Sequence, residues 1–116
     1  MRAQMAVMLA LWTSACGWVP ADEQILLEFF EASAIYDTTM AGRVARVMFD
    51  PRVEGVVTRF DVAGRADTTI DGGLRREATL RAVVRAAGRE RERMLIMSME
   101  RRDSGAWMVT GYRWAG

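Results

Sequence analysis

Histidine and lysine are absent from the sequence, and cysteine occurs once. Without histidine, the chain lacks the commonest general base and the commonest metal-binding side chain of proteins. The single cysteine, Cys16, allows neither an internal disulfide nor a cage of thiolates around a metal. These absences argue against metal-dependent chemistry and against a histidine-assisted hydrolase.

An excess of positive charge is also absent. The 16 basic residues, all of them arginine, stand against 15 acidic residues. Only Arg2 precedes Cys16, so residues 16–116 carry equal numbers of both signs. Nucleic-acid binding depends on basic side chains that neutralise phosphates. The composition therefore predicts no nucleic-acid binding, and nothing in it suggests a metal or another cofactor.

The longest apolar stretch near the start of the chain is too short to span a membrane. Met5–Trp12 is an uninterrupted run of eight apolar residues. As a helix it would reach about 12 Å, against about 30 Å for the hydrocarbon core of a bilayer. Arg2 precedes the run and the small residues 13–15 follow it. This order is typical of a secretory signal.

The segment Ser14-Ala15-Cys16 resembles the lipobox of bacterial lipoproteins, which ends in small residues before a cysteine that is lipidated. The resemblance implies a signal peptide over 1–15, and a lipidated N-terminus with a tether over 16–21. It also implies a protein that faces the periplasm and is held in membrane lipid through Cys16. Gly17 after the cysteine favours the outer membrane.

Two other interpretations of the N-terminus remain open. Thr13 stands where lipoproteins usually have leucine, so an ordinary signal peptidase could cleave after Ala15. The product would then be a secreted or periplasmic soluble protein. A wrongly assigned start followed by a cytosolic domain is the third interpretation.

Helical spacing follows the predicted tether. Asp22 suits a helix cap, and Ile25, Leu26, Phe29 and Tyr36 recur on one face, which predicts a helix over 22–36. Thr38 or Thr39 could begin a second helix whose apolar face holds Met40, Val44, Val47 and Met48. Pro51 is expected to end it, because the residue before proline avoids the helical region.

Beyond Pro51 the apolar period changes from 3.6 to 2, which predicts strands. Val56, Thr58, Phe60 and Val62 alternate with residues of another face, and a polar loop is expected over Asp67–Gly73. Residues 74–86 form the clearest strand, with one apolar face that Arg76 interrupts. A tight turn at Gly88, a central strand over 93–99, a hairpin at 103–105 and a last strand over 106–114 complete the pattern.

Residues 22–116 are therefore expected to form a single α+β domain. In it, the N-terminal helix and a short second helix pack on a curved, four-stranded antiparallel sheet. This order, with the closing strand Gly105–Tyr112, resembles the nuclear transport factor two-like superfamily, whose cone-shaped sheet wraps a helix. Phe29, Tyr36, Phe60, Leu80 and Trp107 are predicted to share the core.

The superfamily includes isomerases and dehydratases that act inside the cone, and also non-catalytic binding proteins. No catalytic position of those enzymes maps onto this chain, so no catalytic residue is predicted. Tyr36 and Asp37, where the first helix ends, and Arg76 on the apolar face are candidate polar residues of a cavity. The more ordinary interpretation is a core tyrosine, a helix-terminal carboxylate and an arginine at the rim.

Two further patterns have ordinary interpretations. The six methionines at 40, 48, 94, 97, 99 and 108 are expected to fill a core more than to line a pocket. In Arg89–Arg93 the charges alternate, so a strand would place arginines on one side and glutamates on the other. The expected result is a solvated edge with cross-strand pairs, not a binding patch.

The sequence thus predicts a cell-envelope lipoprotein that acts as a non-catalytic binding or interaction module. A small apolar ligand or an envelope protein is the expected partner, and oligomerisation is left open. A small cavity enzyme of the isomerase or dehydratase type is the alternative. A polar residue in a deep closed cavity would favour the enzyme, and a filled cone would favour the binding module.

Overall fold

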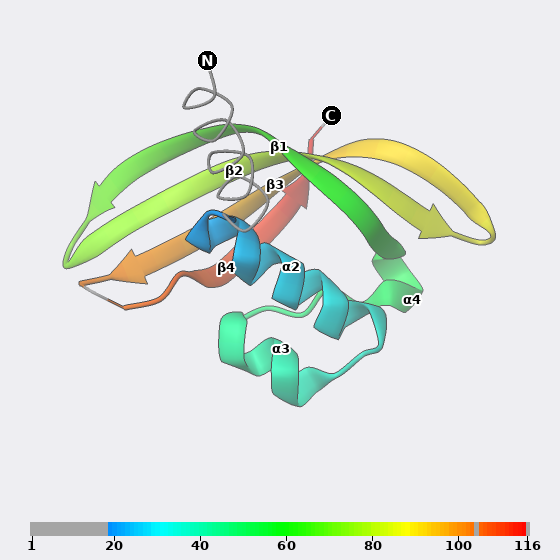
Figure 1. The fold of residues 1–116 in the computed structure, drawn as a ribbon, viewed down its shortest axis with the longest axis horizontal. Coiled ribbons are helices and arrows are strands. Elements are labelled where there is room, and N and C mark those ends of the chain that lie inside the picture. The colour runs from blue at the N-terminus through cyan, green and yellow to red at the C-terminus, as the bar shows by residue number, and fades with distance from the viewer. Residues whose placement is uncertain (1–18, 104, 116) are drawn as a thin grey trace, which may run out of the picture.

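The computed structural model describes residues 19–103 and 105–115 (Figure 1), so the predicted signal and Cys16 lie outside the described residues. Three helices come first in this part of the chain: α2 (Ala21–Ala34), α3 (Thr38–Val44) and α4 (Pro51–Glu54). The strands β1 (Val56–Ile70), β2 (Gly73–Ala86), β3 (Arg89–Arg102) and β4 (Met108–Trp114) follow. They form one open antiparallel sheet in the order β1-β2-β3-β4. The predicted α+β class, with helices before a four-stranded meander, is confirmed.

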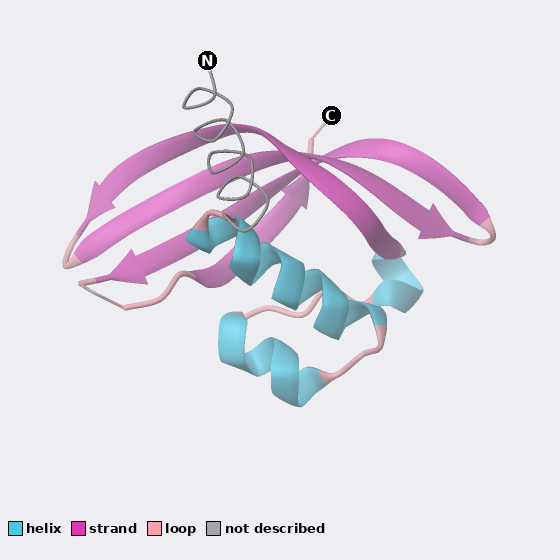
Figure 2. Cartoon of the chain, in the orientation of Figure 1, coloured by secondary structure: helices cyan, strands magenta, loops and turns pink. Residues whose placement is uncertain are grey.

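One side of the curved sheet, here called the inner face, is covered by α2 (Figure 2). The predicted alternation on β2 is confirmed, because Ala78, Leu80, Ala82 and Val84 are all buried on this face. On β3 the same face carries Leu95, Met97 and Met99, which have no exposed surface. None of the helices among the described residues combines the length and hydrophobicity needed to cross a bilayer.

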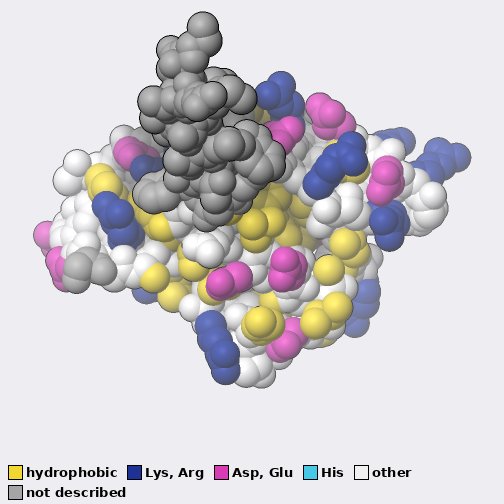
Figure 3. Space-filling model, in the orientation of Figure 1, with side chains coloured by type: hydrophobic (Ala, Val, Ile, Leu, Met, Phe, Trp, Pro, Cys, Tyr) yellow, Lys and Arg dark blue, Asp and Glu magenta, His cyan; other side chains and the backbone are white. Residues whose placement is uncertain are grey.

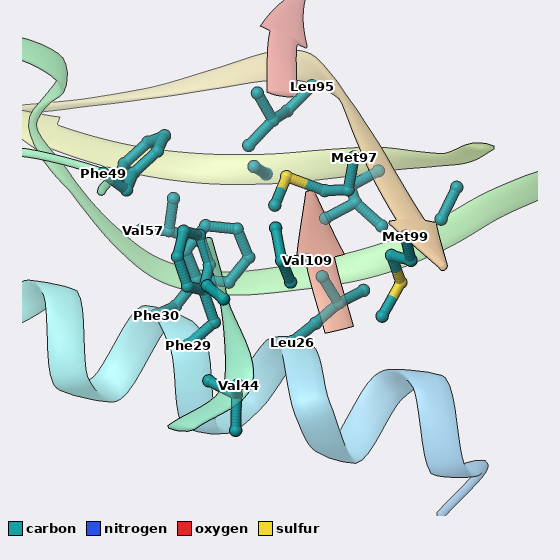
Figure 4. Packing of buried hydrophobic residues seen from close by; sticks show 14 of the residues in the cluster. Leu26, Phe29, Phe30, Val44, Phe49, Val57, Leu95, Met97, Met99 and Val109 are labelled. Carbon is teal, nitrogen blue, oxygen red and sulfur yellow. The ribbon is translucent and has the colours of Figure 1, made fainter. Parts of the chain in front are cut away.

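The core lies between α2 and the inner face, and aromatic side chains fill its middle (Figure 4). Phe29 and Phe30 of α2 are buried, with ring centroids 6.3 Å and 5.5 Å from that of Phe49. Phe49 precedes α4 and also meets Tyr112 of β4 at 4.9 Å. Burying one such ring contributes about 1.5–3 kcal/mol, so Phe49 fastens the helical segment to the last strand.

The second helix is shorter than predicted. Asp37 caps α3, not Thr38 or Thr39: its side chain accepts a hydrogen bond from Met40 N. The helix ends at Val44 because Ala45 pairs with Val109 of β4, and Arg46 N donates to the carbonyl oxygen of Val109.

The sequence suggested that Pro51 ends the second helix, and this prediction is wrong. Pro51 occupies the first position of the separate helix α4, where its missing N–H has no partner to lose. Asp50 caps α4, and its side chain accepts a hydrogen bond from Arg52 N.

The first strand is longer than predicted. The expected polar loop over Asp67–Gly73 is strand as far as Ile70, and only Asp71 and Gly72 form the turn. Polar side chains are compatible with this strand because the register pairs Asp67 with Arg76 across the sheet.

Two irregularities in β1 change which residues face the core. The register shifts at Thr58, between Val57 and Arg59, and again between Val62 and Gly64. An extra residue reverses the direction of the side chains that follow it. Val57 consequently lies on the same face as Phe60 and Val62, whereas the sequence had placed it on the opposite face.

The predicted core is correct for three of its five residues. Phe29, Leu80 and Trp107 are buried, and Phe60 is partly buried against the core. The prediction that Tyr36 lies in the core is wrong, because 45% of its surface is exposed. The helix has ended by this point, and the positive φ of 56° at Tyr36 turns the side chain away from the apolar stripe.

The methionines divide between core and surface. Met97 and Met99 are fully buried, and Met94 and Met108 are half-buried on the other side of the sheet. Met40 and Met48 are exposed, so the apolar face predicted for the second helix is wrong at these two positions. Ala41, Val44, Ala45 and Phe49 are the buried residues of that segment.

The β2–β3 turn provides a stability test. Ala87 and Gly88 have φ values of 52° and 75°, a left-handed pair that favours asparagine followed by glycine. Alanine in this region costs about 1 kcal/mol. We expect Ala87→Asn to raise the free energy of unfolding by about 1 kcal/mol in urea titrations, because asparagine tolerates this conformation. The matched control Ala66→Asn, at an exposed strand position, should give no increase; an equal increase in both variants would contradict the turn assignment.

Candidate functional site

Side chains fill the space between α2 and the inner face. Leu80 of β2, Leu95 and Met97 of β3, and Val109 of β4 have no exposed surface. Figure 4 shows side chains of the sheet and of α2 directed toward one another. Four hollows among the described residues are open surface depressions of about 170 to 280 Å³. Candidate sites therefore lie among polar side chains and at the surface.

The most buried polar cluster centres on Asp22, in the first turn of α2. Its side chain is 1% exposed, and Oδ2 accepts hydrogen bonds from Arg65 Nε at 2.7 Å and from Arg76 Nη1 at 3.0 Å. The predicted capping role is wrong: α2 begins one residue earlier, after Pro20, without a side-chain cap. The two arginines of the sheet bind the carboxylate instead.

Two more carboxylates complete this group, here called the ionic cluster (Asp22, Glu23, Arg65, Asp67 and Arg76). Arg76 Nε and Nη2 donate to both oxygens of Asp67, its partner across the sheet, at 2.7 Å and 2.9 Å. Arg65 Nη2 donates to Glu23 Oε1 at 3.0 Å. The cluster therefore joins α2 to β1 and β2.

An aromatic ring extends the ionic cluster toward β4. The guanidinium carbons of Arg76 and Arg101 lie 4.6 Å and 4.9 Å from the ring centroid of Trp107. A cation over an indole ring is worth about 0.5–2 kcal/mol, more where water is excluded. Trp107 is buried, so its ring packs against the Arg76 guanidinium on the inner face of the sheet.

The electrostatics of Asp22 are those of a structural ion pair. Burial raises the pKa of Asp22, but the hydrogen bonds and charges of Arg65 and Arg76 outweigh burial and hold it below the usual 3.8. Asp67, together with Asp22, raises the pKa of Arg76 beyond its usual range. A carboxylate whose pKa is lowered is a weak base near neutral pH. The geometry therefore suits a connection between elements, not proton transfer.

The polar residues singled out from the sequence do not come together. Tyr36 is exposed, with the Arg52 guanidinium 4.7 Å from its ring centroid. Asp37 caps α3, and Arg76 belongs to the ionic cluster. Each thus has a structural role, and a ligand contact for any of them stays a prediction. Asp22 and Asp67, the partners of Arg76, were not identified, because only the bulges of β1 and the tertiary fold bring them near it.

A second polar site lies on the inner face at the β2–β3 hairpin. A hollow of about 250 Å³ is lined there by Arg89, Arg91 and Arg93 of β3, with Glu54, Val84, Ala86 and Ala87; we call it the arginine hollow. The register places Arg91 opposite Val84 and Arg93 opposite Ala82, so the arginines share one side of the strand, as their alternation predicts. Figure 3 shows several basic side chains at this end of the molecule, with acidic ones among them.

The one carboxylate that lines the arginine hollow is already bound. Glu54 accepts hydrogen bonds from Tyr112 Oη at 2.6 Å and from Trp114 Nε1 at 3.0 Å. The guanidinium carbon of Arg93 lies 4.0 Å from the Trp114 ring centroid. Among the described residues, Arg89, Arg91 and Arg93 form no ion pair. Three arginines therefore face the hollow without an ion pair, and the Glu54 carboxylate, whose hydrogen-bond donors are neutral, is the one negative charge in the lining.

Comparison with protein-family models, with curated proteins and with solved structures finds no match for this chain. In the described part of the chain, no group of three histidine, cysteine, aspartate or glutamate side chains is placed to hold a metal ion. The two candidate sites differ in their charges: the arginines of the ionic cluster are paired with carboxylates, whereas those of the arginine hollow form no ion pair among the described residues.

Removing the central carboxylate should destabilise the fold. We expect Asp22→Asn to lower the free energy of unfolding by about 3 kcal/mol, because Arg65 and Arg76 would lose a buried partner. The matched variant Glu28→Gln, at an exposed position of α2, should change it by less than about 0.5 kcal/mol. Chemical denaturation checks both values.

The same variant has a pH signature. The lowered pKa of Asp22 gives stability that is present above the usual value of 3.8 and is lost as the pH falls below it. This part of the acid destabilisation should be missing in Asp22→Asn. Identical acid profiles for the two proteins would show that Asp22 is not the responsible group.

Tyr112 gives the corresponding test at high pH. Burial, with the bound Glu54 carboxylate, raises the pKa of Tyr112 from 10.0 to about 12. Ionisation then favours the unfolded chain, so stability is full below pH 10 and decreases between pH 10 and about 12. In Tyr112→Phe this decrease should be smaller, although the variant is less stable near neutral pH by about 1 kcal/mol. Equal slopes would contradict the Tyr112–Glu54 contact.

Proposed function

We propose that this chain is an exported lipoprotein of the cell envelope that acts as a non-catalytic binding module. Membrane lipid holds it through Cys16, and its folded domain faces the periplasm. The sequence before Cys16 supports export, and the geometry of the folded part supports the binding role. The helix-first, curved-meander order also supports a relation to the nuclear transport factor two-like superfamily.

The start of α2 supports a position close to the membrane. The helix begins at Ala21, which leaves residues 17–20 between a lipidated Cys16 and the domain. Four residues span at most about 14 Å when extended. The ionic cluster is at this end of the sheet, because it contains the first turn of α2. The arginine hollow is at the other end of β2, about 33 Å away along the strand.

The filled core is the observation that carries the non-catalytic role. Interior positions of the sheet are occupied by fully buried Leu80, Leu95, Met97 and Val109, so a substrate would have no internal site there. The buried carboxylate, Asp22, is held by two arginines and has a lowered pKa. An isomerase of the kind considered above needs a base whose pKa is near the working pH. The pKa of Asp22 is shifted the other way, below its usual value.

Lipid attachment is tested by mass and by fractionation in a bacterial host with the lipoprotein pathway. We expect the native protein in the membrane fraction, beginning at Cys16 and heavier than the bare chain by a diacylglyceryl group and an acyl chain. One acyl chain anchors a protein only marginally, whereas two or three do so stably. Cys16→Ser should release the domain into the soluble fraction without these additions.

Ser14→Ala is the matched control, because it changes the same signal but keeps a small residue and the cysteine. It should behave as the native protein does. Recovery of the native protein in the soluble periplasmic fraction with an unmodified Cys16 would replace the lipoprotein proposal with plain secretion. An uncleaved chain in the cytoplasm would refute export.

A further inference from the structure

The sheet has an open edge beside the arginine hollow. β4 ends at Trp114, which pairs with Leu95, so β3 continues through Arg89–Met94 with no described strand on that side. Ala115 N donates to Met94 O at 3.0 Å, so the backbone groups of Met94 point toward this edge. Backbone groups alternate in direction along a strand, and those of Glu90 and Glu92 therefore point the same way.

Charge and hydrogen-bonding capacity coincide at this edge. The side chains of Arg89, Arg91 and Arg93 line the inner face, while Glu90 and Glu92 lie on the outer face, where Glu90 approaches Arg85 at 3.5 Å. Alternate residues of a strand are about 6.8 Å apart. An added strand would present its own alternate side chains at this same spacing, opposite the three arginines.

We propose that the edge over Arg89–Met94 binds an acidic peptide segment in extended conformation, as an added strand antiparallel to β3. This inference rests on the proposed function as a binding module and names its partner. The peptide carries aspartate or glutamate at alternate positions, and these carboxylates face Arg89, Arg91 and Arg93. Its backbone pairs with the free N–H and C=O groups of Glu90 and Glu92.

The geometry favours charge-assisted hydrogen bonds, because neighbouring side chains already hold two residues of the arginine hollow in place. Trp114 holds Arg93 by stacking, and Glu54 is retained by Tyr112 and Trp114. Hydrogen bonds between guanidinium and carboxylate groups are about twice as strong as neutral ones. Backbone pairing then supplies affinity, and the arginine spacing selects the alternating pattern.

A second copy of this edge is a poor partner. Two antiparallel strands related by a twofold axis perpendicular to the sheet keep their inner faces on the same side. The arginine row of one copy would then face the arginine row of the other. Like charges that face each other across strands are destabilising. The alternating charges of Arg89–Arg93 thus discourage self-pairing while they admit an acidic strand.

The test uses the full mature protein in detergent and two fluorescent peptides of equal charge. The first alternates threonine with three glutamates; the second has the same composition with the glutamates in one block. We expect the alternating peptide to bind about tenfold more tightly by fluorescence anisotropy, and binding to weaken as salt rises. Equal affinity for both peptides, or no binding of either, would overturn the proposal.

Two matched pairs of variants separate charge from strand addition. Arg91→Glu should weaken the alternating peptide about tenfold, whereas Arg81→Glu, an equal charge change on the outer face of β2, should not. Glu92→Pro removes an N–H at the open edge and should also weaken binding about tenfold; Glu92→Ala retains the N–H and should not. Arg89→Glu repeats the charge test if one variant is unstable, and thermal unfolding checks that each is folded.

Other occupants of the edge give different results. Tight binding of single-stranded DNA or inorganic phosphate, lost in Arg91→Glu but kept in Glu92→Pro, would identify a general anion site and refute strand addition. A dimer in sedimentation that Arg91→Glu alters would identify a second copy as the occupant. Lipid attachment is judged by mass and peptide binding by anisotropy, so the failure of one proposal is distinguishable from that of the other.

Discussion

The position of α2 on the sheet depends on one buried carboxylate. Asp22 contacts Arg65 of β1 and Arg76 of β2, so a single side chain fixes the first turn of the helix against two strands. Apolar packing alone would permit small shifts of the helix along the inner face, because hydrophobic contacts are not directional. Charged hydrogen bonds are directional and are costly to break once buried. The ion pairs therefore hold the first turn of α2, and the aromatic core holds the helix farther along.

The ionic cluster in turn depends on the bulges of β1. Without the shift between Val62 and Gly64, the strict alternation of a strand would direct Arg65 and Asp67 to the solvent side. The extra residue brings both to the inner face, opposite Ala78 and Arg76. The same face is thus apolar along its middle and ionic toward the β1–β2 turn. A bulge is a property of two paired strands, and the residue types of 56–63 do not by themselves indicate one.

The sequence predicted what local spacing controls. Helical spacing over 22–36, the period of two on β2 and the turn residues at Gly88 and 103–105 were sufficient to predict a helix followed by a four-stranded antiparallel meander. Features that depend on distant partners escaped: Asp22 was interpreted as a cap, and Phe49 was not singled out. Pro51 was interpreted as the end of a helix that it does not belong to. The exposed Tyr36 shows the same limit, since a helical stripe does not reveal where the helix stops.

Only part of the candidate site could be predicted from local sequence pattern. The arginine row was visible in the sequence because alternation places Arg89, Arg91 and Arg93 on one side. The role of this row was not visible, because a solvated edge has the same pattern of alternating charges. The fold adds two observations that the sequence could not supply: β4 ends before it reaches this part of β3, and Glu54 accepts hydrogen bonds from Tyr112 and Trp114. Asp22, Asp67 and Glu23 pair with the arginines of the ionic cluster, whereas Arg89, Arg91 and Arg93 form no ion pair among the described residues. The inner face therefore has one end where ion pairs join α2 to the sheet and another where three arginines have no ion pair among the described residues.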